Sequence, residues 1–134
     1  MLPSKIASST RLALAEMLQA QPALEFAVLV GSRATGTAQA DSDWDLALKW
    51  GHELDWLETA ARTEQLRRAL ARVLAVDESR VDLIDLRRAN LAMRASVAEE
   101  GIPLAGEDGL AWMHFLLRTW RELEDFYWER QHAA

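Results

Sequence analysis

Two apolar stretches separated by a short polar loop dominate the first half of the chain. Residues 24–30 are nearly all apolar and rich in strand-forming residues, and this run stops at Gly31. From Ser42 to Trp50 apolar and polar positions alternate, which is typical of a strand with one buried face. The residues expected on the buried face are Trp44, Leu46, Leu48 and Trp50; those expected on the other are Asp43, Asp45, Ala47 and Lys49.

Helical periodicity predicts most of the remaining structure. Apolar residues recur at three- and four-residue intervals in four segments, which are 4–20, 54–74, 89–100 and 110–130. Residues 80–86 predict a third strand, and residues 102–105 predict a short edge strand. The pattern therefore predicts a single α+β domain over residues 1–134, with a small mixed sheet of three to four strands flanked by helices and a long C-terminal helix.

Composition narrows the class of protein. With 134 residues, of which 50% are hydrophobic and 27% charged, the chain is long enough to bury a core of its own. The absence of cysteine excludes disulfides and thiolate zinc sites. The N-terminus does not resemble a signal peptide and no apolar run reaches membrane-spanning length, so we expect a cytoplasmic protein without a membrane partner.

The formal net charge of −6 argues against a protein that binds along the phosphate backbone of a nucleic acid. Such binding needs a basic surface, and the chain has no block of like charge. We therefore expect no direct nucleic-acid partner. A nucleotide that arrives with its own divalent cations remains compatible with this charge.

Carboxylates interrupt two of the predicted strands. Asp43 and Asp45 are one residue apart, where they repel each other unless a cation lies between them. As solvated acids they would continue the turn of Asp41 and Ser42, but a lone charge within WDLAL is poorly placed without a ligand. Asp82 interrupts the third strand, RVDLIDL, in the same way. Three strand-borne carboxylates beside a Gly-Ser turn suit a phosphoryl-transfer site with two Mg²⁺ ions.

Four other residues enter this hypothesis with less weight. Gly31 at the end of a strand lets the backbone approach a ligand closely, and the Ser32 hydroxyl can bind a phosphate oxygen. Arg33 can meet a phosphate, although an exposed loop arginine without a ligand is an equal reading. Asp85 competes with Asp82 as the third carboxylate, but it lies on the opposite face near the strand end, so Asp82 is preferred.

The C-terminal helix carries six of the ten aromatic residues, which are Trp112, Phe115, Trp120, Phe126, Tyr127 and Trp128. One helix face cannot hold all six, because the adjacent residues 126–128 alone span about 200° around the helix. Some of these aromatics are expected to close the core. The others, in the helix over about residues 110–130, predict an interface with a partner.

The loop and its acids together resemble a known signature. Gly31-Ser32, ten residues and then Asp43-Trp44-Asp45 resemble the GS-x10-DxD motif of the DNA polymerase β-like nucleotidyltransferase superfamily. The run GSRATGTAQADSDWDLAL, with VDL at residues 81–83, is similar to the minimal nucleotidyltransferase (MNT) branch. The resemblance covers roughly residues 24–86. It departs from the usual pattern at Trp44, where an aliphatic residue is common, and this change affects the core face.

The resemblance implies a role for each matching residue. Ser32 and the Gly31 backbone would hold the triphosphate, and Asp43 and Asp45 would bind two Mg²⁺ ions. Asp82 would bind one of these ions and help to deprotonate the acceptor hydroxyl. The reaction would transfer a nucleoside monophosphate to that hydroxyl and release pyrophosphate.

The resemblance also implies a partner. Small MNT proteins are typically antitoxins paired with a HEPN-domain ribonuclease toxin, and members use ATP to AMPylate a toxin tyrosine. We therefore expect an adenylyltransferase antitoxin in a hetero-oligomer with a HEPN toxin; ATP follows from the resemblance alone, because the chain has no recognisable base-reading motif. Two alternatives stay open. One is transfer to a small-molecule hydroxyl, although residues 110–134 are too short for the additional substrate domain that this branch usually carries. The other is neutralisation of the toxin by occlusion without catalysis.

Overall fold

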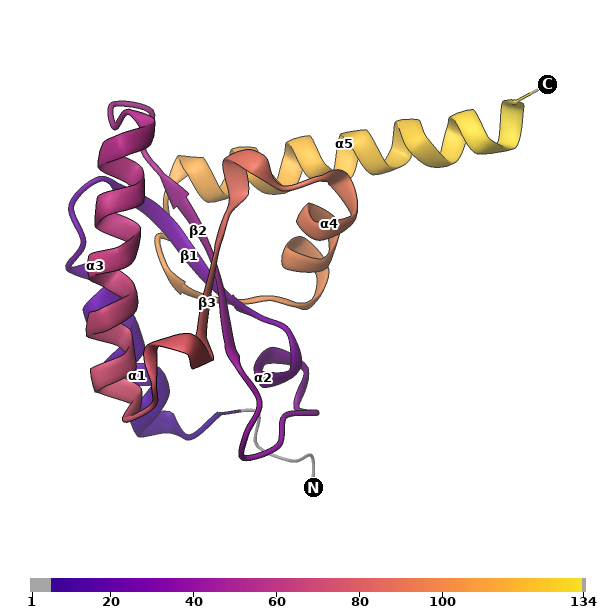
Figure 1. Ribbon diagram of the computed structural model, residues 1–134. Coiled ribbons are helices and arrows are strands. Elements are labelled where there is room, and N and C mark those ends of the chain that lie inside the picture. The colour runs from indigo at the N-terminus through magenta and orange to yellow at the C-terminus, as the bar shows by residue number, and fades with distance from the viewer. Residues whose placement is uncertain (1–5, 134) are drawn as a thin grey trace.

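The computed structural model describes residues 6–133 and contains one four-stranded mixed sheet (Figure 1). The strands are β1 (Leu24–Val30), β2 (Trp44–Trp50), β3 (Val81–Asp85) and β4 (Ile102–Ala105), in the order β3-β2-β1-β4. Strand β1 is antiparallel to both β2 and β4, whereas β2 and β3 are parallel. The predicted α+β class and the predicted edge strand are confirmed.

Helices cover both faces of the sheet. They are α1 (Ser8–Gln19), α2 (Ser32–Thr35), α3 (Trp56–Leu74), α4 (Leu91–Glu100) and α5 (Leu110–His132), with 3₁₀ turns η1 (Glu78–Arg80) and η2 (Leu86–Arg88). Helices α1 and α3 pack on one face, while α4 and the first turns of α5 pack on the other. The C-terminal part of α5 extends beyond the rest of the molecule (Figure 1). None of the helices in the described chain has the length and apolar character that crossing a membrane requires.

The alternation predicted for β2 is confirmed. Its four apolar residues on one face are buried against α1 and α3. Ala47 lies on the opposite face, in a second core cluster with Phe26 and Val97. Since burial of one large apolar side chain contributes roughly 1.5–3 kcal/mol, this alternation supplies much of the free energy that fixes the register of β2.

Local signals place the ends of the elements. Helix α3 begins two residues later than predicted because Asp55 and Glu58 form a capping box around its first turn. Asn90 caps α4 through a hydrogen bond that its side chain accepts from the N–H of Met93. Strand β2 begins at Trp44 instead of Ser42 because the Ser42 carbonyl accepts hydrogen bonds from arginine side chains. The predicted start of the first helix, residue 4, lies outside the described residues.

Candidate active site

The turn after β1 brings the backbone against a carboxylate. Gly31 has φ +71°, a conformation that L side chains rarely adopt, and a Cβ at this position would collide with the Asp45 carboxylate. Ser32 then begins the short helix α2, which ends at Gly36 in the left-handed conformation. The Gly-Ser turn and Asp45, which are well separated in sequence, are therefore direct neighbours.

Two of the three predicted acids lie opposite each other on adjacent strands. The parallel register pairs Asp45 of β2 with Asp82 of β3, so both side chains lie on the same face of the sheet. Asp85 is paired with Leu48 and lies on the other face, where its carboxylate accepts a hydrogen bond from the N–H of Arg87 at 3.0 Å. The structure thus brings Asp82, and not Asp85, against Asp45.

The three acids affect one another electrostatically. The pKa of Asp45 is raised above its usual value, first by burial, then by the charges of Asp82 and Asp43, and last by a hydrogen bond with Asp82. The ionised form of Asp45 is therefore less favourable in the metal-free protein than it is for an isolated carboxyl group. A cation bound to this carboxylate would remove the repulsion.

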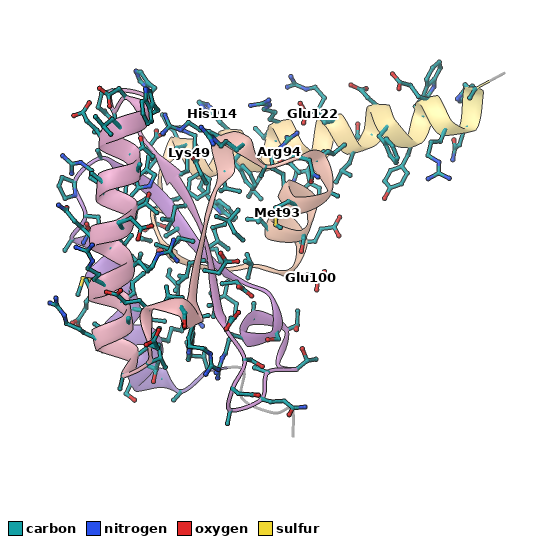
Figure 2. The ribbon with its side chains drawn as sticks, in the orientation of Figure 1. Lys49, Met93, Arg94, Glu100, His114 and Glu122 are labelled. Carbon is teal, nitrogen blue, oxygen red and sulfur yellow. The ribbon has the colours of Figure 1, made fainter. Side chains whose placement is uncertain are left out.

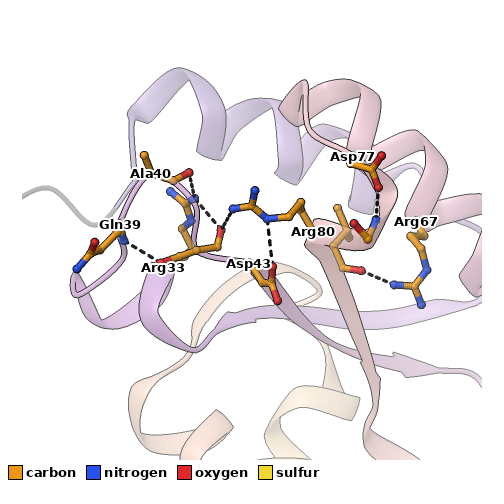
Figure 3. Close-up of polar contacts among 10 residues, drawn as sticks. Arg33, Gln39, Ala40, Asp43, Arg67, Asp77 and Arg80 are labelled. Carbon is orange, nitrogen blue, oxygen red and sulfur yellow. Dashed lines mark hydrogen bonds and ion pairs between the residues drawn. The ribbon is translucent and has the colours of Figure 1, made fainter.

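Asp43 has a different neighbour. Its Oδ1 lies 3.2 Å from Nε of Arg80, and the side chain of Asp43 is 55% exposed. Figure 3 shows Arg80 between the loop before β2 and Asp43. Within residues 6–133, no three histidine, cysteine or acidic side chains form a ready-made metal cluster. In this conformation Asp43 is held by an arginine.

The predicted phosphate-contacting residue Arg33 is engaged with the same loop. Its Nη2 donates hydrogen bonds to the Ser42 carbonyl at 2.9 Å and to the Ala40 carbonyl at 3.4 Å. The guanidinium carbon lies 4.3 Å from the centre of the Trp44 ring, which is a cation–π contact. This contact gives a physical role to the tryptophan that departs from the family pattern.

Sequence reasoning did not find Arg80, although a signal for it exists. The parallel register pairs Trp44 with Val81, so extending it by one residue places Arg80 beside Asp43. A basic residue immediately before the strand that carries Asp82 is that signal. Reading it requires the pairing of β2 with β3, which follows from the topology of the sheet.

The donor set suits a magnesium ion. Mg²⁺ prefers oxygen ligands and is commonly bound through carboxylates together with substrate phosphates. Asp45 and Asp82 face each other at the edge of the Gly-Ser turn, and Asp43 precedes Asp45 by two residues on the same strand end. Burial and, after it, the charges of Asp82 and Asp43 raise the pKa of Asp45, and a cation would offset those charges.

A separate concave region lies at the other end of β2. Its volume is about 460 Å³, and Figure 2 shows three of its lining residues, Lys49, Arg94 and His114, near one another beside α5. Lys49 is paired with Glu25 at 2.7 Å, and Arg94 is paired with Glu122. None of the three acids lines this cavity, so it is not part of the candidate active site.

Known proteins resemble this chain in sequence and in fold. Residues 13–109 match the polymerase β nucleotidyltransferase family. The protein adenylyltransferase MntA of Aphanizomenon flos-aquae (strain 2012/KM1/D3) is 30% identical over 91 residues, which are 66% of this chain and 61% of that protein. The chain thus aligns with about three fifths of the length of this relative.

Two solved structures resemble the whole fold. One is a toxin–antitoxin structure with AMP-PNP, with a TM-score of 0.67 and 28% identity over 90% of this chain and 92% of that chain. The other is an MNT antitoxin in complex with a tri-AMPylated HEPN toxin from Shewanella oneidensis, with a TM-score of 0.63 and 28% identity over 92% and 91% of the two chains. Since the family match includes the Gly-Ser turn, all three acids and the four strands, the chain belongs to the polymerase β nucleotidyltransferase family.

Proposed function

We propose that this protein transfers AMP from ATP to a tyrosine hydroxyl of a partner HEPN ribonuclease toxin and thereby neutralises the toxin. The observation that carries the proposal is the convergence of Gly31, Asp45 and Asp82 at one edge of the sheet. The similar MntA adenylyltransferase and the similar antitoxin crystallised with an AMPylated toxin support the choice of reaction and partner.

The nucleotide site consists of the turn after β1. The backbone of Gly31 approaches the triphosphate closely, and the Ser32 hydroxyl donates to a phosphate oxygen. Arg33 completes this site as the next residue of the turn. Because its Nη2 donates to the loop carbonyls, Arg33 contacts phosphate through its other N–H groups.

The three acids form the metal site. Asp43 and Asp45 hold two Mg²⁺ ions, and Asp82 holds one of them beside the acceptor. Bound Mg²⁺ offsets the phosphate charge and lowers the pKa of the acceptor hydroxyl. The pKa of Asp45, which is raised by burial and then by the charges of Asp82 and Asp43, supports this assignment.

The transfer step follows from these positions. A tyrosine hydroxyl has a pKa of about 10, so at neutral pH it needs a carboxylate to accept its proton. Asp82 accepts that proton as the hydroxyl oxygen attacks the α-phosphorus of ATP. The bond from the α-phosphorus to the bridging oxygen of the β-phosphate breaks, and pyrophosphate leaves.

Helix α5 is the partner surface in this proposal. Its buried side places Trp112 and Phe115 against Phe26 of β1. Its solvent side exposes a set of apolar residues, which are Leu110, Met113, Leu117, Trp120, Tyr127 and Trp128. The first four recur at intervals of three and four residues, so they form one stripe along the helix. Because an exposed stripe of this size suits a helix-to-helix contact, we assign it to the toxin.

The test is the intact mass of the toxin after incubation with this protein, ATP and Mg²⁺, alongside its ribonuclease activity. The proposal expects added AMP units and a matching loss of ribonuclease activity. Asp82→Asn should slow the transfer strongly while ATP binding survives. Asp85→Asn is the matched control, since Asp85 lies on the same strand but on the other face, and it should retain transfer.

One outcome would falsify the catalytic proposal. Full neutralisation of the toxin without a change in its mass, unaffected by Asp43→Asn, leaves occlusion as the better account. Transfer of AMP to a small hydroxyl compound but not to the toxin would instead support the small-molecule alternative.

A further inference from the structure

Two arginines from different parts of the chain converge on one backbone oxygen. The Ser42 carbonyl accepts a hydrogen bond from Nη2 of Arg33 at 2.9 Å and from Nη2 of Arg80 at 3.3 Å. Arg33 belongs to α2 and Arg80 to η1, immediately before β3 (Figure 3). This carbonyl therefore links the Gly-Ser turn and the start of β3 to the residue that precedes Asp43.

Arg80 makes a second contact, with Asp43 itself. Its Nε donates to Oδ1 of Asp43 at 3.2 Å, and the arginine side chain is 32% exposed. Among the ion pairs of the described residues, this is the only one that includes any of the three acids. Arg80 is thus the cation that offsets the clustered negative charge in the metal-free protein.

An ion pair at this place has a consequence for metal binding. Arg80 donates to one carboxylate oxygen of Asp43, Oδ1, and a Mg²⁺ ion on the same carboxylate would repel the guanidinium. Metal binding to Asp43 therefore competes with the contact that Arg80 makes. The pair is partly exposed, so its strength is modest and its release is feasible.

Arg33 is placed to keep the loop fixed during that release. Its guanidinium stacks on Trp44, whose exposed fraction is only 9%, and its Nε is buried without a hydrogen-bond partner among the described residues. A guanidinium held between a buried ring and two carbonyls is more constrained than the exposed pair at Arg80. When Arg80 leaves Asp43, the contact of Arg33 with Ser42 remains.

We propose that Arg80 is a positioning residue that holds Asp43 in the metal-free protein and yields it to Mg²⁺, while Arg33 keeps the Ser42 carbonyl in place. Arg80 therefore competes with the metal and sets the Mg²⁺ concentration at which the site fills. This inference rests on the metal-dependent function proposed above and adds a regulator of its metal affinity.

The test is thermal denaturation of the whole protein in saturating AMP-PNP, titrated with Mg²⁺. Arg80→Gln should lower the melting temperature of the metal-free protein by about 1–4 °C. It should also lower the Mg²⁺ concentration at half-maximal stabilisation about threefold or more, because the competing cation is gone. Arg68→Gln is the matched control: it removes the exposed Arg68–Glu78 pair at 3.7 Å, which includes none of the three acids, and should leave the Mg²⁺ midpoint unchanged.

A second, more conservative variant keeps the test valid if Arg80→Gln does not fold. Arg80→Lys keeps the charge but cannot reach Asp43 and the Ser42 carbonyl with a planar fork, so its Mg²⁺ midpoint should lie between those of the wild type and Arg80→Gln. A midpoint that is unchanged or higher in both variants overturns the role of Arg80 and leaves the proposed function standing. If Mg²⁺ stabilises neither the wild type nor the variants, the metal site itself is overturned, and the role of Arg80 with it.

Discussion

The two faces of β2 have opposite tasks within seven residues. On one face Trp44, Leu46, Leu48 and Trp50 are almost completely buried against α1 and α3. On the other face Asp45 lies opposite Asp82, and burial and neighbouring charge raise its pKa. The apolar face stabilises the fold whatever the ligand, whereas the acidic face carries repelling charges that a bound cation would offset. One strand therefore couples a rigid scaffold to a site with unfavourable charge.

The comparison also explains why the acids stay in position despite their repulsion. The face of β2 that packs against α1 and α3 is called the scaffold face. Each of its buried apolar residues contributes roughly 1.5–3 kcal/mol to the stability of the fold. Like charges on facing strand positions cost only about 0.2–1 kcal/mol. The scaffold face therefore holds Asp45 against Asp82 at a small net cost, and that cost is available to favour metal binding.

The largest expected effect is a loss of catalysis without a loss of stability, from a change on the acidic face of β2. Asp45→Asn should reduce AMP transfer to the toxin by about 1,000-fold or more, equivalent to about 4 kcal/mol, because the variant removes a metal-binding carboxylate. The same change should leave the metal-free fold intact or slightly more stable. Transfer is measured by intact mass of the toxin and stability by thermal denaturation with a chelator. Normal transfer by this variant would show that the acidic face is not the metal site.

The scaffold face should respond in the opposite way. Leu46→Ala, one residue away and fully buried, should lower the free energy of unfolding by about 2–5 kcal/mol, because it leaves a cavity under α1 and α3. The residual folded protein should still bind Mg²⁺ and nucleotide with near wild-type affinity. Urea denaturation measures the first effect, and nucleotide titration well below the melting temperature measures the second. A loss of stability below about 1 kcal/mol would contradict the burial of this face.

Helix α5 repeats the comparison with aromatic residues on two sides. Trp128 is 60% exposed, so Trp128→Ala should leave the melting temperature nearly unchanged and weaken toxin binding by about 2 kcal/mol. Trp112 packs edge-on against Phe26 with centroids 5.0 Å apart, and Trp112→Ala is the matched control that should destabilise the isolated protein. Calorimetric titration with the toxin measures the free energy of binding. Equal destabilisation by both variants would mean that α5 serves only the core.

The elements themselves are predictable from the sequence because each carries a local signal. The alternation of apolar and polar residues over 42–50 predicts which side chains of β2 are buried. The structure keeps this period of two along the strand. Element ends are less predictable, since the capping of α3 by Asp55 and the engagement of the Ser42 carbonyl depend on side chains that reach back to the backbone.

The candidate site is predictable only in part. The motif names Gly31, Asp45 and Asp82, and the strand periodicity correctly separates Asp82 from Asp85. The contact of Arg80 with Asp43 and that of Arg33 with Trp44 were missed, because they depend on the parallel pairing of β2 with β3 and on the path of the loop before β2. A linear spacing does not contain that pairing. The metal and phosphate contacts of these residues stay predictions.

The smallest expected effect concerns pH. Because the pKa of Asp45 is raised in the folded state, the native protein binds more protons than the unfolded chain between about pH 4 and the raised value. The contribution of Asp45 to stability therefore falls as pH rises through that window. Since other groups titrate as well, the measured quantity is the difference between Asp45→Asn and the wild type in the presence of a chelator.

That difference should favour the asparagine variant at neutral pH, by less than about 1 kcal/mol, and should shrink as pH falls below the raised pKa. Mg²⁺ with AMP-PNP should reverse its sign at neutral pH, because the cation then favours the ionised carboxylate of the wild type. Melting temperatures from about pH 4 to pH 8 measure both parts. A difference that stays constant across this range would mean that the repulsion among Asp43, Asp45 and Asp82 is absent, and that the acidic face is no less stable than the apolar face it opposes.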